Sequence, residues 1–328
     1  MNRQLGGQVP GYRRLTRTAM LAVLAAAALL LAACSSSSTS TSGAGSTSSP
    51  SSASAVGTGK SLTLGTKDFT EEFIIGALYQ LALQAKGYKI NYKPNIGATE
   101  VIDKALTSGQ IDAYPEYTGE SAVTVAGINT TPTSPQQEYD LAKAFYAKRG
   151  QSMSAMTPFF DTDAIAVTKA YAAKYGLKTT ADLKKIPHFT LGARPEFQGR
   201  QQGAAGLEKV YGIHNFTFKS LALGLQYQAL DSGAVNAADV FTTDPQLASG
   251  KYVVLADPKN VFGFQNIALV INTKKLNELG GQQFMSIINQ VNALLTTPAI
   301  IAMNKAVAID KHQPQDVAKT FLSANHII

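Results

Sequence analysis

The sequence predicts an α/β fold in two lobes, and three observations lead to this expectation. Short apolar strands alternate with amphipathic helices from residue 60 onward, the pattern of a largely parallel sheet covered by helices. Segment 34–328 has 295 residues, more than one hydrophobic core comfortably supports. Cys34 is the only cysteine, so no intramolecular disulfide can form and the core alone must stabilise the fold.

The beginning of the folded part can be divided into elements. A strand is expected over 62–65, and Asp68 with Glu71 three residues later predicts an N-cap and a capping box. Apolar residues at helical spacing follow as far as Lys86-Gly87, where the helix should end. A strand over 89–92, a helix over 97–106 and a strand over 111–114 complete a strand, helix, strand, helix, strand unit.

Two later segments predict where the lobes divide. Segments 162–168 and 265–271 are similar apolar strands that could carry the chain across a gap, and further strands are expected near 164–167, 189–192, 237–241 and 252–255. We therefore expect one lobe from 61–165 together with 265–328 and a second lobe from 166–264, joined by two hinge strands.

The N-terminus has the features of an export signal. Arg13, Arg14 and Arg17 precede an apolar segment over 19–31, which at about 13 residues is shorter than the roughly 20 needed to span a bilayer. Residues 1–33 therefore fit a signal peptide. Leu31-Ala-Ala-Cys34 resembles a bacterial lipobox, which implies acylation of Cys34 and a chain anchored in the membrane on its extracytoplasmic face. The alternative is an ordinary signal peptide with an incidental cysteine.

Residues 34–60 are expected to be a tether. Segment 35–59 consists almost entirely of Ser, Thr, Gly and Ala, without an aromatic or charged residue, and cannot bury a core. A glycosylated stalk would serve the same mechanical role. Removal of residues 1–33 takes away four arginines and lowers the net charge from +7 to +3, so we expect no nucleic-acid partner.

The sequence lacks the common signatures of catalysis. It has no Gly-x-Ser-x-Gly, no phosphate loop, no His-Glu-x-x-His and no cysteine nucleophile. No metal-ligand spacing connects His188, His214, His312 and His326, so neither a metal nor a cofactor is expected. The chain is predicted to be a binding protein rather than an enzyme. A surface enzyme or a cell-wall interaction lipoprotein stays open as an alternative, with Glu120, Asp163 and Asp244 as its candidate groups.

Polar motifs lie at strand ends and loop starts, the side on which α/β sheets bind ligands. The six motifs are Gly65-Thr-Lys-Asp-Phe-Thr-Glu-Glu, Gly97-Ala-Thr-Glu-Val, Asp112-Ala-Tyr-Pro-Glu-Tyr-Thr-Gly-Glu, Arg194-Pro-Glu-Phe, Gln226-Tyr-Gln-Ala-Leu and Ala238-Asp-Val-Phe-Thr-Thr-Asp. Over about 62–321 they resemble the substrate-binding proteins of osmoprotectant ABC importers, which bind glycine betaine, choline, carnitine and relatives. The resemblance implies a two-lobed, type II periplasmic-binding-protein fold that traps a small molecule by lobe closure. It also implies a monomer that delivers its ligand to a membrane permease driven by a cytoplasmic ATPase.

The resemblance also indicates residues of the binding site. A quaternary ammonium group donates no hydrogen bond, so such proteins surround it with aromatic rings. By resemblance, Tyr117 and Tyr227 belong to this aromatic box, while Lys67 and Arg194 bind a ligand carboxylate. Taken singly, these side chains could equally be packing aromatics and solvated charges.

Three positions depart from the family pattern. Asp163 replaces a tyrosine of the box, Phe241 replaces another tyrosine, and Glu120 replaces a threonine. Asp161 and Asp244, the other acids of these segments, complete the candidate ligand-binding residues.

The new acids leave the ligand open. Glu120 and Asp163 could form internal ion pairs with Lys67 and Arg194, or they could bind a cationic or hydroxyl-rich ligand. We therefore expect weaker binding of glycine betaine than a full tyrosine box gives. A polyamine, an amino acid or a polyhydroxylated compound is the alternative ligand in the same transport role.

Overall fold

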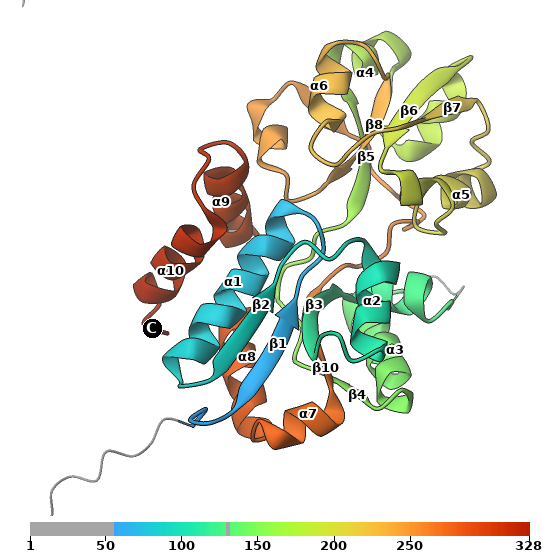
Figure 1. Ribbon diagram of the computed structural model, residues 1–328. Helices are drawn as coiled ribbons and strands as arrows, with labels where there is room; N and C mark the ends of the chain where they lie inside the picture. Colours follow the sequence, from blue (N-terminus) through green and yellow to red (C-terminus); the bar gives the residue numbers. More distant parts are fainter. Residues whose placement is uncertain (1–55, 129–131) are drawn as a thin grey trace, which may run out of the picture. The chain divides into compact units, whose positions relative to one another are not determined.

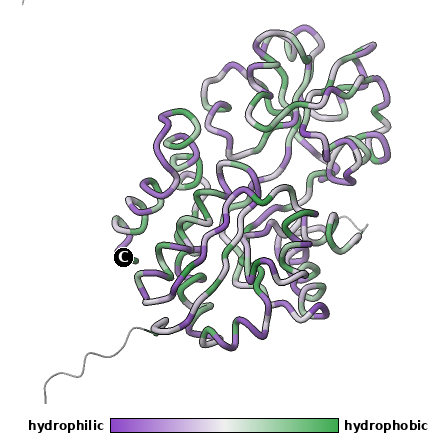
Figure 2. Tube along the Cα trace, viewed as in Figure 1, coloured by the Kyte–Doolittle hydropathy of each residue, from purple (hydrophilic) through white to green (hydrophobic). Residues whose placement is uncertain are grey.

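A computed structural model describes residues 56–128 and 132–328 of the chain. The predicted signal peptide, Cys34 and tether residues 34–55 lie outside the described residues. The end of the predicted tether is described and is not free, because Gly57 is buried and its N donates to Lys86 O at 2.8 Å. Residues 61–328 form two five-stranded mixed sheets with helices on their faces (Figure 1), which is the predicted α/β class. Hydrophobic residues follow the strands and the inner sides of the helices, while the loops are mostly hydrophilic (Figure 2).

The first sheet has the strand order β2-β1-β3-β10-β4. Its strands are β1 (Ser61–Gly65), β2 (Lys89–Lys93), β3 (Ala113–Tyr117), β4 (Gln151–Met153) and β10 (Ile267–Asn272). Strands β2 and β3 run parallel to β1, whereas β10 is antiparallel to β3 and β4. The strand expected over 111–114 begins two residues later and extends to Tyr117.

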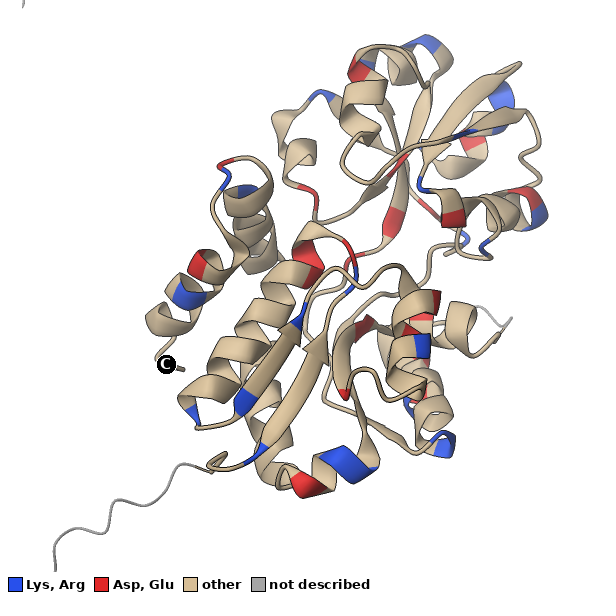
Figure 3. Cartoon of the chain, in the orientation of Figure 1, with Lys and Arg blue, Asp and Glu red and all other residues tan. Residues whose placement is uncertain are grey.

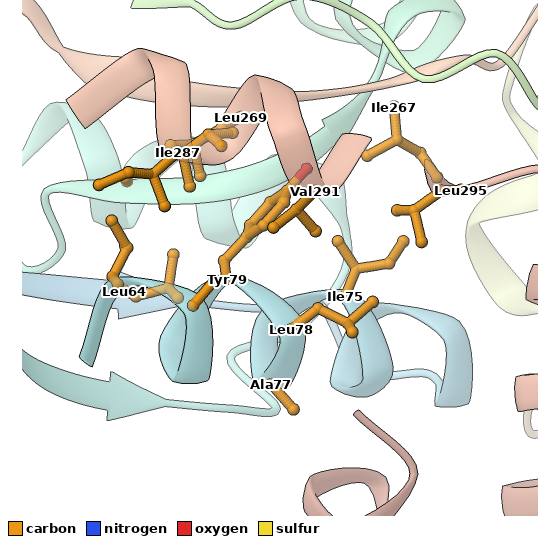
Figure 4. Packing of buried hydrophobic residues seen from close by; sticks show 14 of the residues in the cluster. Leu64, Ile75, Ala77, Leu78, Tyr79, Ile267, Leu269, Ile287, Val291 and Leu295 are labelled. Atoms are coloured by element: carbon orange, nitrogen blue, oxygen red, sulfur yellow. The ribbon is translucent and has the colours of Figure 1, made fainter. Parts of the chain in front are cut away.

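Helices cover both faces of this sheet. They are α1 (Thr70–Ala85), α2 (Thr99–Thr107), α3 (Pro135–Lys148), α7 (Thr273–Glu278), α8 (Gln282–Leu294), α9 (Thr297–Ala308) and α10 (Pro314–Ala324). On one face, α1 and α8 bury a core around Ile75, Tyr79 and Val291 (Figure 4). Residues of α2 and α3, including Ile102 and Tyr146, form the core of the opposite face.

The start of α1 differs from the sequence prediction. Phe69, not Asp68, is the N-cap residue, and no side chain caps the helix. Glu71 cannot complete a capping box because its buried carboxylate accepts hydrogen bonds from Tyr117 and Thr243 instead. The predicted capping box is therefore wrong, and the acid serves a site that the helix start faces.

The second sheet has the strand order β7-β6-β8-β5-β9. It contains β5 (Asp163–Thr168), β6 (Phe189–Ala193), β7 (Phe216–Ser220), β8 (Ala237–Phe241) and β9 (Tyr252–Val254). Strand β6 is parallel to β7 and β8, and β5 is antiparallel to β8 and β9. The α-helices between these strands are short: α4 (Lys169–Tyr175), α5 (Ala204–Gly206) and α6 (Gln226–Asp231).

The chain passes between the sheets twice, in segments 154–162 and 255–266. The two apolar strands that we expected to carry the chain across the gap lie instead within the sheets, β5 in the second and β10 in the first, and each directly follows a crossing. A bridge between Phe160 and Asn266 and a hydrogen bond from Asp161 N to Gln265 O (3.1 Å) hold the crossings together. The expected boundary between residues 165 and 166 falls within β5, which lies wholly in the second sheet, so the first crossing ends before Asp163.

Within residues 56–128 and 132–328, no single helix is both long and apolar enough to cross a bilayer. Helices α8 and α9 reach the required length and apolar content only as a pair bent by 86°.

Replacement of a core residue on α1 should destabilise the protein. Ile75 is fully buried between α1 and the first sheet, so Ile75→Ala removes packed methyl groups and leaves a cavity. We expect a loss of about 2–5 kcal/mol in unfolding free energy, measured by urea denaturation. The control Val101→Ala, at a side chain 52% exposed, should lie within about 0.5 kcal/mol of the wild type. Equal effects of the two substitutions would contradict the assigned core.

Candidate binding site

A cavity of about 50 Å³ lies where strands of both sheets end. That space exceeds the roughly 10–15 Å³ that one water needs. Its wall includes the loop after β1, the ends of β3 and β8, and the residue after β6. Of the predicted site residues, the structure brings seven to this wall: Lys67, Tyr117, Glu120, Asp161, Asp163, Arg194 and Phe241.

Two predicted residues do not line this cavity. Tyr227, on α6, packs against Tyr252 with ring centroids 5.1 Å apart. Its hydroxyl donates to Asp244 Oδ2 at 2.8 Å. Asp244 lies on a second cavity beside the first. The structure thus gives Tyr227 a place in the core of the second sheet rather than in an aromatic box.

Three aromatic rings meet at the first cavity. Phe69 lies between the rings of Tyr117 (5.8 Å between centroids) and Phe241 (5.5 Å, planes 22° apart). Phe69 follows β1 and Phe241 ends β8, so the stacked pair joins the two sheets. Sequence reasoning missed Phe69, although it belongs to the Lys67-Asp-Phe motif that carried the resemblance.

The guanidinium of Arg194 is saturated by carboxylates. Both nitrogens of its planar end bind Asp163, Nη1 to Oδ1 at 2.6 Å and Nη2 to Oδ2 at 2.9 Å. Nη1 also donates to Asp239 Oδ2 at 2.7 Å, and Nε lies 3.3 Å from Glu196 Oε1. This bidentate pairing is the strongest mode available to an arginine, so Arg194 is held by the protein itself.

The electrostatics of this cluster follow from burial and charge. Burial would lower the pKa of Arg194, but the nearby charges of Asp163 and Asp239 raise it well above its usual value. Burial raises the pKa of Asp239, and the neighbouring Asp163 raises it further. Arg194 therefore stays charged, and the repulsion between the two acids is part of what raises the pKa of Asp239.

Glu120 and Arg200 connect the sheets on another side of the cavity. The π-helical segment η1 (Glu120–Val125) begins with Glu120, and Arg200 Nη1 donates to Glu120 Oε1 at 2.9 Å. Arg200 Nη2 also donates to Glu100 Oε2 at 2.9 Å. Burial opposes ionisation of Glu120, but the charges of Arg200, Lys67 and Arg194 outweigh it and lower its pKa. Arg200 belongs to none of the sequence motifs, so it was not predicted as a site residue.

Gly119, directly before η1, packs closely against the side chain of Gln265. A Cβ at Gly119 would lie 2.6 Å from Nε2 of Gln265, closer than real side-chain contacts allow. The Gln265 Oε1 accepts from Glu120 N at 3.0 Å, which fixes the start of η1 against the second crossing. A side chain at position 119 would therefore displace the Gln265 amide from this hydrogen bond.

Lys67 is also paired inside the protein. Its ammonium forms an ion pair with Glu116 and lies 4.7 Å from the ring centroid of Tyr117. Burial raises the pKa of Glu116, and Lys67 opposes that shift. Each of the three cations on the cavity wall, Lys67, Arg194 and Arg200, thus has a carboxylate partner among the described residues.

A hydrogen-bonded chain runs from Tyr117 into the second sheet. The Tyr117 hydroxyl donates to Glu71 Oε1 at 2.8 Å, and Thr243 Oγ1 donates to Glu71 Oε2 at 2.6 Å. Thr243 N donates in turn to Asp161 Oδ1 at 2.9 Å. Burial raises the pKa of Glu71 and of Asp161. The network thereby fixes the Tyr117 ring beside the cavity.

Acidic positions gather where the ends of the two sheets face each other (Figure 3). No group of three or more His, Cys, Asp or Glu side chains in the described part of the chain has the arrangement of a metal site. The arrangement can surround a small cation with rings and carboxylates.

Two α/β sheets joined by two crossings, with a cavity at the ends of their strands, define a two-lobed ligand-binding protein. Residues 60–324 match the family described as the substrate binding domain of ABC-type glycine betaine transport systems. The chain therefore belongs to this family.

Individual relatives agree with this assignment. A glycine-betaine-binding protein of Pseudomonas aeruginosa is 29% identical over 282 residues, which cover 82% of this chain and 89% of that protein. The ergothioneine transport permease/ergothioneine binding protein EgtU of Helicobacter pylori is 30% identical over 268 residues, covering 80% of this chain and 47% of that protein, so the chain spans about half its length. A crystal structure of a glycine betaine/carnitine/choline ABC transporter matches with a TM-score of 0.66 and 25% identity, over 81% of this chain and 99% of the other.

Removal of the Arg194 charge should strongly destabilise the second sheet. Arg194→Met leaves Asp163 and Asp239 buried without their cation, and we expect a loss of about 3–5 kcal/mol in unfolding free energy by chemical denaturation. Lys251→Met, which breaks an exposed pair with Asp231, is the control and should leave the denaturation midpoint unchanged. A wild-type midpoint in Arg194→Met would contradict the structural role of the cluster.

Proposed function

We propose that this protein is the extracytoplasmic receptor of an ABC importer and that its ligand is a quaternary ammonium cation. The observation that carries this proposal is the group of rings of Phe69, Tyr117 and Phe241 on a cavity wall that also contains Asp161 and Asp163. A quaternary ammonium has no N–H group, so ring faces and negative charge are what attract it, each ring contributing about 0.5–2 kcal/mol. Membership of the glycine betaine family supports the same class of ligand.

The ion pairs favour a ligand without a carboxylate. A zwitterion such as glycine betaine needs a cation for its acidic end, yet Lys67, Arg194 and Arg200 already bind carboxylates of the protein. Binding of a ligand carboxylate would break one of these buried pairs or place two acids side by side. We therefore propose that choline-like cations bind more tightly than glycine betaine.

Ergothioneine is a second candidate, because the Helicobacter pylori relative at 30% identity is named for it. It is itself a trimethylammonium betaine, so the rings could hold its cationic end, but its carboxylate meets the same saturated arginine. Polyamines, amino acids and polyhydroxylated compounds are the further alternatives in the same transport role.

The mechanism that we propose is lobe closure. Arg200 reaches from the second sheet to Glu100 and Glu120 of the first, and the Phe69–Phe241 stack and the Thr243–Glu71 hydrogen bond also link the two sheets. A cation held between rings of both sheets adds contacts that only the closed arrangement makes, so it shifts the population toward that arrangement. A permease that prefers the closed form would then receive the loaded protein.

The cellular context is proposed from the sequence. Acylation at Cys34 would hold the protein at the outer face of the membrane, and residues 35–59 would tether the folded part within reach of a permease with a cytoplasmic ATPase. We propose that the protein acts as a monomer, binds one small molecule and catalyses no reaction. On this proposal, the described residues that line the cavity bind the ligand, and none of them acts as a catalytic group.

Ligand titration tests the proposed site. Isothermal titration calorimetry of the purified protein should give a dissociation constant for choline at least tenfold below that for glycine betaine. Phe241→Ala removes one ring and should weaken choline binding about tenfold, since about 1.4 kcal/mol corresponds to that factor. Phe160→Ala, at a phenylalanine 44% exposed that does not line the cavity, should leave the affinity unchanged. Submicromolar glycine betaine binding tighter than that of choline would overturn the ligand preference.

The arginine between the sheets offers a test of closure. Arg200→Met removes the ion pairs to Glu100 and Glu120, so we expect a larger radius of gyration by small-angle scattering without ligand, and faster dissociation of choline. Arg149→Met is the matched control, because its ion pair with Asp103 (2.9 Å) lies within the first lobe. If the scattering curves and the dissociation rates of both variants equal the wild type, Arg200 does not stabilise the closed form.

A further inference from the structure

A second cavity of about 170 Å³ adjoins the first and shares Phe69, Phe241 and Asp161 with it. Its wall is formed by the start of α1, the first crossing, the residues before α6, the segment after β8, and α9. The charged residues on this wall are all acidic: Asp68, Glu71, Asp161 and Asp244. No lysine, arginine or histidine is among the described residues that line it, in contrast to the first cavity.

Neutral donors of the protein bind three of these acids, and no cation does. Glu71 accepts from Tyr117, Thr243 and Asn304. Asp161 accepts from Thr242 Oγ1 and Thr243 N, and Asp244 accepts from Tyr227 Oη and Phe241 N. No ion pair to these three carboxylates is formed within residues 56–128 and 132–328. They form a negative cluster that has no internal counter-ion.

Two buried acceptors on the wall of this cavity have no partner among the described residues, Gln246 Oε1 and Asn304 Oδ1, and Asn304 is the more deeply buried residue. Asn304, on α9, is only 5% exposed, and its Nδ2 donates to Glu71 Oε2 at 2.8 Å and to Thr243 Oγ1 at 3.2 Å. Its Oδ1 is buried and has no hydrogen-bond donor among the described residues. The amide cannot turn over, because its oxygen would then face the carboxylate of Glu71. An unpaired buried acceptor lowers the stability of the folded protein, so a hydrogen-bond donor supplied by a ligand would be stabilising at this site.

We propose that the second cavity binds a protonated amine, an N–H-donating cation, as a subsite distinct from the aromatic site for quaternary ammonium. A primary ammonium group carries three donors and one charge. It can donate to Asn304 Oδ1 while its charge compensates the cluster of Glu71, Asp161 and Asp244. A quaternary ammonium has no donor for Asn304, so the two cavities select different classes of cation.

The proton equilibria of the cluster agree with an absent cation. Burial raises the pKa of Glu71, Asp161 and Asp244, and the charge of Asp244 raises the pKa of Glu71 and Asp161 further. A bound cation would lower these pKa values, because it favours the charged form of each carboxylate.

Ethanolamine and choline test the proposal, because they share a carbon skeleton and differ in the three methyl groups on nitrogen. By calorimetry, ethanolamine should bind to the wild type, and it should bind one further equivalent when choline is saturating. Asn304→Leu, close in volume but without the amide, should weaken ethanolamine at least tenfold and change choline affinity less than twofold. Asp244→Asn should also weaken ethanolamine at least tenfold.

Asp257 provides a matched control for Asp244. Asp257 also accepts from a tyrosine hydroxyl (Tyr211, 2.5 Å) and from a backbone N–H (Phe262, 3.0 Å), but it lines neither cavity. Asp257→Asn should therefore leave ethanolamine binding as in the wild type.

Three outcomes would overturn the proposal: loss of ethanolamine binding at saturating choline, equal weakening of both ligands by Asn304→Leu, or an effect of Asp257→Asn as large as that of Asp244→Asn. Displacement of ethanolamine by potassium chloride but not by tetramethylammonium chloride would assign the cavity to an inorganic cation instead. The choline titration reports the aromatic site separately, so the second subsite can fail while the proposed function stands.

Discussion

The ion cluster around Arg194 is the constraint on which the ligand site depends. Asp163 lies on β5 and Asp239 on β8, which are paired strands, while Arg194 directly follows β6 on the other side of β8. One guanidinium thus ties three adjacent strands together at the edge that faces the cavity. Because buried charges are tolerated only when they are paired, this geometry also removes Arg194 from the groups available to a ligand. The same interaction stabilises the second lobe and sets the charge that a ligand must carry.

In the first lobe, the residue that could cap helix α1 is buried at the cavity instead. Helix α1 begins without a side-chain cap, and Glu71, which could have supplied one, is buried beneath Tyr117. A missing cap typically costs about 1 kcal/mol of helix stability. Three hydrogen bonds to the Glu71 carboxylate offset burial of that group, and the one from the Tyr117 hydroxyl fixes the tyrosine ring. A local sequence rule fails here because the residue serves the site, which is where such rules are expected to fail.

The alternation of strands and helices could be predicted from the sequence, because apolar patterns and turn residues act locally. The strand ends around Lys67, Tyr117 and Arg194 could be predicted from their motifs, and the structure brings them to one cavity. The partners of these residues could not be predicted, because Asp239 reaches Arg194 through pairing of strands that are 45 positions apart. Arg200 and Phe69 act across the two sheets, so their roles depend on a contact between lobes that no local pattern encodes. Tyr227 had the expected motif, yet α6 directs it toward Tyr252 and Asp244.

The two neighbouring cavities differ in how their charge is compensated, and on our proposals this difference would select between cations. In the first, the cations of the wall have protein partners and three aromatic rings line the cavity, which suits a cation that donates no hydrogen bond. In the second, the acids lack a counter-ion and Asn304 lacks a donor. A quaternary ammonium placed there would leave that acceptor unsatisfied, at a cost of about 1–3 kcal/mol. The ring faces offer a primary ammonium no oxygen acceptor for its three N–H donors. The stacked rings of Phe69 and Phe241 belong to both walls, so the two proposed subsites would share one aromatic pair while differing in the number of N–H groups that each accepts.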